Sequence, residues 1–230
     1  MTSKFLDYLK DSNEKTYNNP IGDRSLYGIR IYIKEPITDR IDLKGCFDYI
    51  FGRMPKKIYQ NVERVMIGNF PFLNKRKVHA MYENGTIYLT NVHEDESTFI
   101  SDMVHEVAHS FEEKEKEEIY KDEKIKNEFI SKRQTLFRLL DSHGLINQKF
   151  TEEDFMDTSY QEKFDLFVHE EIGYETIGNV APNLFVSPYG CTSLREYFAN
   201  GFENFFVNDY EVVKKISPNV YEKIINFLEF

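Results

Sequence analysis

The chain has 230 residues, of which 41% are hydrophobic, enough for the core of one large domain or two small lobes. Its formal net charge of −10 argues against a nucleic-acid partner, which favours a basic face, and against an anionic membrane surface. The two cysteines, Cys46 and Cys191, are far apart and lack metal-ligand spacing. We therefore expect a globular chain with buried or half-buried thiols and no disulfide framework.

Residues 1–18 read as a short polar helix, and they contain no apolar run suited to a secretory signal. No stretch approaches the roughly 18 consecutive apolar residues of a membrane span. We expect a soluble protein that is cytoplasmic as synthesised, and the sequence leaves its final compartment open.

The first 90 residues predict strands, short helices and a hairpin. Residues 25–33 alternate in polarity and predict one strand, and 62–67 predict a second. The spacing over 43–60 is helical, with breaks near Gly52 and Pro55. Residues 77–83 and 86–90 flank Asn84-Gly85, the strongest short hairpin signal in the chain.

The rest of the chain predicts mostly helix. Residues 112–128 are dense in Glu and Lys, which indicates a solvated helix face, and helix continues with a break until His143-Gly144. Residues 151–171 predict another helix, 174–192 a loop, and 193–230 helix in pieces divided near Asn208 and Pro218. The pattern predicts an α+β fold, mainly helical, with a small mixed sheet that ends in an edge hairpin.

One helical segment carries the sequence His-Glu-x-x-His. His105 and His109 are four residues apart, so their rings leave the same helix face one turn from each other and can share one Zn²⁺. Glu106 lies between them, where a carboxylate can act on a zinc-bound water. The four other histidines show no comparable spacing and are assigned no role: His79, His93, His143 and His169.

A second helix, after residue 193, offers a third ligand. Glu196, Asn200 and Glu203 share one face of this helix, and a carboxylate on a second helix would complete a site of two histidines and one glutamate. Glu203 and Glu175 are the alternatives to Glu196 as the ligand.

These stretches resemble the catalytic domain of anthrax lethal factor and its relatives, a family that includes clostridial peptidases cutting between prolines. The family pattern is Tyr-Gly, a short turn, and then Glu-aromatic-Phe-Ala. Here Tyr189-Gly190 precedes Glu196, which Tyr, Phe and Ala follow, at the same separation. The similarity covers residues 77–115 and 185–230. It implies a single zincin-like domain: a sheet and active-site-helix lobe over 1–115, a helical insertion over 116–184, and a C-terminal helical lobe over 185–230.

The resemblance implies a zinc metalloendopeptidase with one Zn²⁺ per chain, held by His105, His109 and Glu196. Glu106 would activate the zinc-bound water, and Tyr189 would donate a hydrogen bond to the oxyanion. The family often has Glu where Asn200 stands, so Asn200 or Glu203 would support a zinc ligand. A protein or peptide substrate would extend along the 77–90 hairpin.

Two classes of function follow. The first is such a peptidase, as a toxin-like effector or one carried by a phage or mobile element. The second is a peptidase-fold binding or inhibitory protein that has lost turnover, with the helix over 112–128 as its contact surface. The presence of both Glu106 and Tyr189 favours the enzyme, because a site without turnover has no chemical need for either. The sequence does not indicate the substrate or the oligomeric state.

Overall fold

The computed structural model describes residues 23–146 and 150–229. The chain forms two compact units, residues 1–110 and 111–230, and the division falls inside helix α5 (Glu96–Tyr120). Helices predominate, and one small sheet belongs to the first unit, so the predicted α+β class is confirmed. The helix expected over 1–18 lies outside the described residues. Within the described part, no helix has the length and apolar character needed to cross a membrane.

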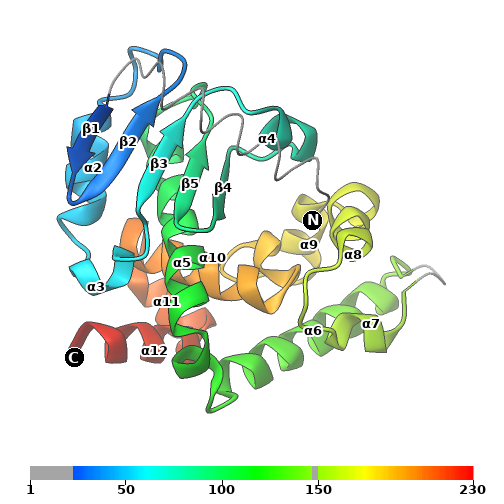
Figure 1. Ribbon diagram of the computed structural model, residues 1–230. Coiled ribbons are helices and arrows are strands. Elements are labelled where there is room, and N and C mark those ends of the chain that lie inside the picture. Colours follow the sequence, from blue (N-terminus) through cyan, green and yellow to red (C-terminus); the bar gives the residue numbers. More distant parts are fainter. Residues whose placement is uncertain (1–22, 147–149, 230) are drawn as a thin grey trace. The chain divides into compact units, whose positions relative to one another are not determined.

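The sheet of the first unit has five strands in the order β1-β2-β3-β5-β4 (Figure 1). The outer pairs β1–β2 and β5–β4 are antiparallel, whereas β2, β3 and β5 run parallel. The prediction of a mixed sheet ending in an edge hairpin is therefore confirmed. The strands are β1 (Asp23–Leu26), β2 (Ile29–Ile33), β3 (Arg64–Ile67), β4 (Ala80–Glu83) and β5 (Thr86–Leu89).

The prediction of a single strand over 25–33 is wrong. The backbone reverses at Tyr27 and Gly28, whose φ angles are 58° and 84°, and Leu26 pairs with Ile29 across the turn. Tyrosine rarely adopts a positive φ, so Gly28 was the only turn signal at this point. The alternating polarity on either side of it predicted a continuous strand instead.

The predicted Asn84-Gly85 hairpin is confirmed. Their φ angles are 47° and 75°, as a two-residue turn with matching twist requires, and Glu83 pairs with Thr86. The N–H of Thr90 donates to the carbonyl of His79 at 2.8 Å, which makes these two a hydrogen-bonded pair. Because such pairs alternate, the main-chain groups of Ala80 and Tyr82 face away from β5, toward the outer edge.

Each sheet face carries a row of apolar side chains. On one face Tyr32, Met66, Tyr88 and Met81 are register partners, and they pack beneath Phe72 of α4 (Pro71–Arg76) and its neighbours. On the other face the corresponding row is Ile31, Val65, Ile87 and Tyr82, all buried. The parallel strands are thus covered on both faces, as parallel sheets usually are.

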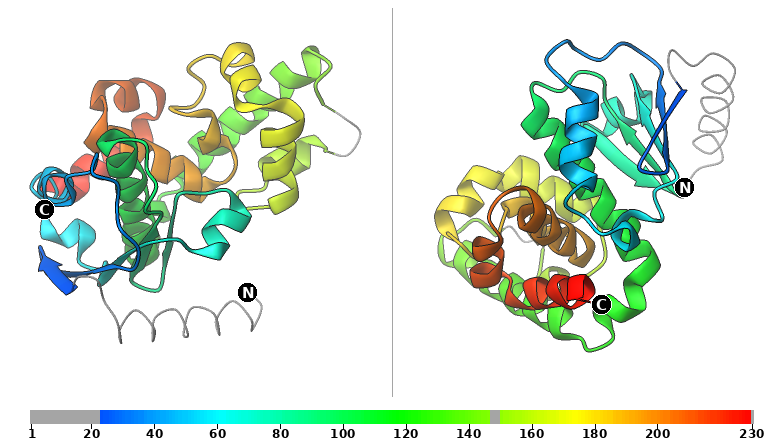
Figure 2. Two further views of the ribbon diagram at one scale, coloured as in Figure 1. Left: turned by 90° about the horizontal axis from the view of Figure 1, so that it is seen from above. Right: turned by 90° about the vertical axis from the view of Figure 1, so that its left-hand side faces the viewer.

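Two short helices follow β2 in the first unit. They are α2 (Leu43–Phe51) and α3 (Lys56–Tyr59), and the first ends at Gly52 while Pro55 caps the second, so the predicted breaks are confirmed. Figure 2 shows α2 alongside the sheet, and its Phe51 contacts the rings of Tyr27 and Tyr59. The N–H of Asp42 donates to the Glu96 carboxylate at 2.8 Å, which ties the start of α2 to α5.

All the regular secondary structure in the described part of the second unit is helical. The helical stretch predicted over 151–171 is confirmed, although it is broken into three pieces. The predicted loop over 174–192 contains two short helices, so that prediction is wrong. The breaks near Asn208 and Pro218 are confirmed. Its helices after α5 are α6 (Lys124–Ser142), α7 (Glu152–Met156), α8 (Glu162–Leu166), the π-helix η1 (Phe167–Ile172), α9 (Tyr174–Val180), the 3₁₀ helix η2 (Pro188–Cys191), α10 (Leu194–Val207), α11 (Tyr210–Ile216) and α12 (Pro218–Glu229).

Helix α10 is the central element of the second unit. It packs against η2, α6, α11 and α12 (Figure 2). Phe198 and Phe202 of α10 are buried at 1% and 0% exposure, and the ring of Phe202 lies 6.1 Å from that of Phe111. This packing fixes the orientation of the α10 face that carries Glu196.

Candidate metal centre

Helix α5 presents the His-Glu-x-x-His sequence as a regular helical turn. The rings of His105 and His109 have their centroids 4.8 Å apart at an interplanar angle of 84°. His105 is half-buried, and His109 is 5% exposed. The predicted spacing on one helix face is therefore realised, and both imidazoles have a fixed environment in which to bind a metal ion.

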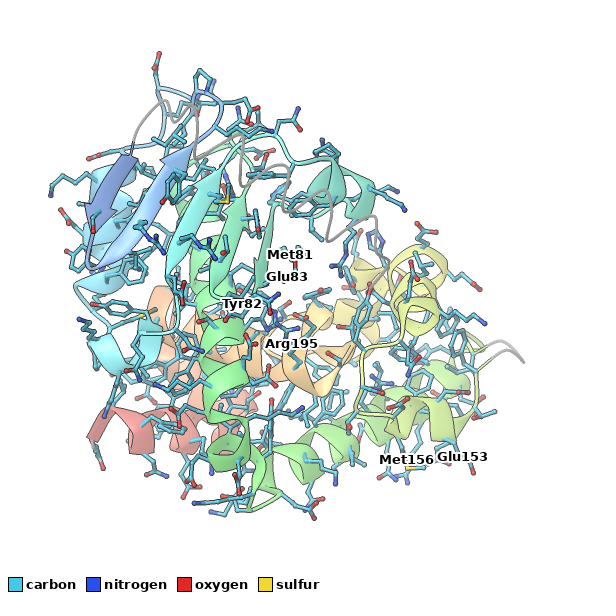
Figure 3. The ribbon with its side chains drawn as sticks, viewed as in Figure 1. Met81, Tyr82, Glu83, Glu153, Met156 and Arg195 are labelled. Atoms are coloured by element: carbon cyan, nitrogen blue, oxygen red, sulfur yellow. The ribbon has the colours of Figure 1, made fainter. Side chains whose placement is uncertain are left out.

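Glu106 is bound to the edge strand of the sheet. Its Oε2 accepts a hydrogen bond from the backbone N–H of Tyr82 at 2.5 Å, and its side chain is buried, with the residue 7% exposed. Tyr82 lies on β4 between Met81 and Glu83 (Figure 3). A buried carboxylate with one oxygen held by a backbone donor has a defined position, while its second oxygen stays available for proton transfer.

Glu196 lies in the first turn of α10, in the second unit. The hydroxyl of Ser193 caps this helix by accepting from the Glu196 N–H at 3.2 Å. The residue is 8% exposed. The dipole of a helix favours a carboxylate at this end.

Tyr189 lies on η2, which packs on α10. A Cβ added to Gly190 would meet the Asn200 side chain at 3.5 Å, so the backbone approaches α10 closely here. Burial, and then the charge of Glu196, raise the pKa of the Tyr189 hydroxyl well above its ordinary value. The phenol therefore keeps its proton at neutral pH and can act as a hydrogen-bond donor.

The other candidates on α10 have less direct roles. Asn200 is buried, and its Nδ2 donates to the carbonyl of Glu196 at 3.0 Å, one turn earlier. It thus bonds to the main chain of the residue expected to bind metal. Glu203 is half-buried, and Glu175 of α9 is exposed.

Glu112 departs from the predicted solvated helix face. It is 6% exposed, its Oε1 accepts from the Tyr120 hydroxyl at 2.7 Å, and its Oε2 lies 3.4 Å from Nε of Arg195. Arg195, which Figure 3 labels, directly precedes Glu196, so this network braces the first turn of α10. Arg195 lies far from the other two members in the chain, so the sequence contains no local signal of its contact with Glu112.

Within the first unit, the side chains of His79, His93 and Asp102 form a group that could hold a metal ion. Sequence reasoning missed this group, because its three members come from separate segments without motif spacing. Of the three ligands that the sequence indicated, His105 and His109 lie together on α5 in the first unit, and Glu196 belongs to the second unit.

Comparisons of the chain with protein-family models, curated proteins and solved structures found no match.

Proposed function

We propose that this protein is a zinc-dependent metalloendopeptidase whose Zn²⁺ is held by His105, His109 and Glu196. Two imidazoles and one carboxylate are the donor set of zinc hydrolases, which keep one position open for chemistry. His105 and His109 present their rings on one face of α5, and Glu196 is a buried carboxylate in the first turn of α10. When bound, the zinc would lower the pKa of a water molecule and polarise the substrate carbonyl.

The observation that carries the proposal is the state of Glu106. Glu106 lies between the two histidines in the sequence. Its carboxylate is buried and accepts a hydrogen bond from the backbone N–H of Tyr82. A purely structural metal site has no need for a non-ligating carboxylate in that place. In the proposed reaction Glu106 takes a proton from the attacking water and delivers it to the leaving amine.

Tyr189 would act on the substrate carbonyl. Because its hydroxyl stays protonated, it can donate a hydrogen bond to the oxygen on which negative charge develops. One such donor contributes roughly 2.7–4 kcal/mol to transition-state stabilisation.

The edge strand β4 suits an extended peptide substrate. The outward main-chain groups of Ala80 can pair with an added strand. The outward N–H of Tyr82 is already bound by Glu106. A peptide backbone paired at Ala80 would therefore pass beside the carboxylate that performs the proton transfer.

A binding or inhibitory protein without turnover is the competing function. Cleavage profiling of a peptide library by the zinc-loaded chain distinguishes the two, with Glu106→Gln as the matched inactive control. We expect cleavage products from the wild type only. Equal product levels from both proteins would refute the mechanism, and intact peptides retained by both would favour the binding protein.

A further inference from the structure

We propose that His79, His93 and Asp102 form a second zinc site, independent of the proposed catalytic zinc. All three residues belong to the first unit, and the set contains none of His105, His109 or Glu196. The site would join three segments of the chain at one ion.

The three side chains converge from different elements. His79 directly precedes the edge strand β4, His93 lies between β5 and α5, and Asp102 is on α5, one turn before His105. Both imidazoles approach the same carboxylate oxygen: Nε2 of His93 lies 3.0 Å and Nδ1 of His79 lies 3.5 Å from Oδ2 of Asp102. One ligand atom from each residue lies within 4.8 Å of the other two.

These distances match the dimensions of a tetrahedral zinc site. Zinc lies about 2.0–2.2 Å from imidazole nitrogen and carboxylate oxygen, so its ligand atoms are about 3.3 Å from each other. The two distances to Asp102, 3.0 and 3.5 Å, lie on either side of that value. The third separation, between the two imidazole nitrogens, is no more than 4.8 Å, so a zinc ion would require the exposed His79 side chain to move toward the other two ligands.

The surroundings supply one fixed ligand and one adjustable ligand. The His93 side chain is 1% exposed, and its ring centroid lies 5.1 Å from that of Phe99. The His79 side chain is 63% exposed, although its carbonyl accepts from the N–H of Thr90. Three protein ligands with solvent access leave the fourth position for water. Two imidazoles and a carboxylate suit Zn²⁺ better than Mg²⁺ or Ca²⁺, which favour all-oxygen sites.

A zinc ion here would have a structural consequence. It would cross-link the start of β4 to α5, one turn before the His-Glu-x-x-His sequence. A ligand that binds the folded chain alone stabilises it, so zinc should stabilise the first unit even when the catalytic ligands are removed.

Zinc alone, titrated into the metal-free full-length chain, tests the site. In a His105→Ala/His109→Ala chain we expect about one zinc per chain by elemental analysis and a rise in Tm with zinc. Adding His79→Ala should remove that zinc, or weaken its binding at least tenfold. A folded double variant that binds no zinc would overturn the proposal. His79, His93 and Asp102 would then be a hydrogen-bonded cluster without a metal.

A second comparison covers the case in which the double variant does not fold. In the otherwise wild-type chain, His79→Ala should lower the zinc content by one ion per chain. His143→Ala, which replaces an exposed histidine at the end of α6, should leave it unchanged. Equal zinc contents in these two variants would overturn the proposal. Because neither variant alters His105, His109 or Glu196, this result is separable from failure of the proposed peptidase activity.

Discussion

The backbone N–H of Tyr82 donates to the Glu106 carboxylate at 2.5 Å, which joins the edge strand β4 to the central residue of the His-Glu-x-x-His turn. In most edge strands such an outward N–H is left to solvent or to an added strand. Here it fixes the carboxylate that we propose as the general base. The strand proposed to receive substrate and the residue proposed to act on it are thus coupled by one hydrogen bond.

Glu106→Gln and Glu106→Ala should separate this structural role from the chemistry. Both should abolish peptide hydrolysis and retain zinc, because neither removes a proposed ligand. Glu106→Gln can still accept from Tyr82, whereas Glu106→Ala leaves that buried N–H unpaired and should lower the free energy of unfolding by about 1–3 kcal/mol. Activity assays, elemental analysis and urea unfolding of both variants check this. Full activity in Glu106→Gln would remove Glu106 from the mechanism.

Glu196→Ala should lose most of the catalytic zinc, whereas Glu203→Ala should keep it. Glu196 is the proposed carboxylate ligand, and its loss would leave two protein ligands for the ion. Elemental analysis after dialysis against a weak chelator measures the difference, best in a His79→Ala background that isolates this site. The reverse pattern would transfer the ligand role to Glu203.

Tyr189→Phe should lower kcat by about 10²-fold with little change in KM or zinc content. The substitution removes only the donor to an oxyanion that forms in the transition state, and such single donors contribute about 10²–10³-fold. Steady-state kinetics on a peptide found by the library screen provide the measurement. A raised KM with unchanged kcat would make Tyr189 a substrate-binding residue.

Arg133→Met should destabilise the second unit strongly. Arg133 is 1% exposed, its guanidinium donates to the carbonyls of Cys191, Thr192 and Asp154, and its centre lies 3.9 Å from the Phe164 ring centroid. Each buried carbonyl left without its donor should cost about 1–3 kcal/mol of unfolding free energy. Denaturant unfolding measures it.

The matched control for Arg133 lies on the same helix. Arg138 is exposed, so Arg138→Met should change the free energy of unfolding by no more than about 0.5 kcal/mol. Equal small effects of the two substitutions would show that the buried guanidinium contributes little.

The two cysteines should resist thiol reagents in the folded protein. Both are buried and free, and burial raises the pKa of Cys46 and of Cys191 to about 12. At pH 8 a thiol with that pKa is about 10⁻⁴ ionised, against about a quarter for an ordinary cysteine. Since the folded pKa is raised, the associated stability is present below about pH 8.5 and is lost toward pH 12. Ellman's reagent should therefore detect two thiols only after unfolding, and rapid reaction at pH 8 would contradict the assignment.

The sequence by itself determined those features that depend on local chemistry. Asn84-Gly85 produces the hairpin because both residues tolerate positive φ. Gly52 and Pro55 separate two helices because glycine has a low helix propensity and proline lacks the N–H that would continue helical hydrogen bonding. The four-residue spacing of His105 and His109 places both rings on one helix face by helical geometry alone.

Only the tertiary structure decided the partners that residues meet across the chain. The bond from Tyr82 to Glu106, the burial of Glu112 and the convergence of His79 and His93 on Asp102 all join segments with no shared motif. Tyr27 adopts its uncommon left-handed φ in the turn between β1 and β2, where the local alternation predicted a continuous strand. The physical reason is common to these cases: local propensities differ by about 1 kcal/mol or less, whereas burial and hydrogen bonding between distant segments contribute more.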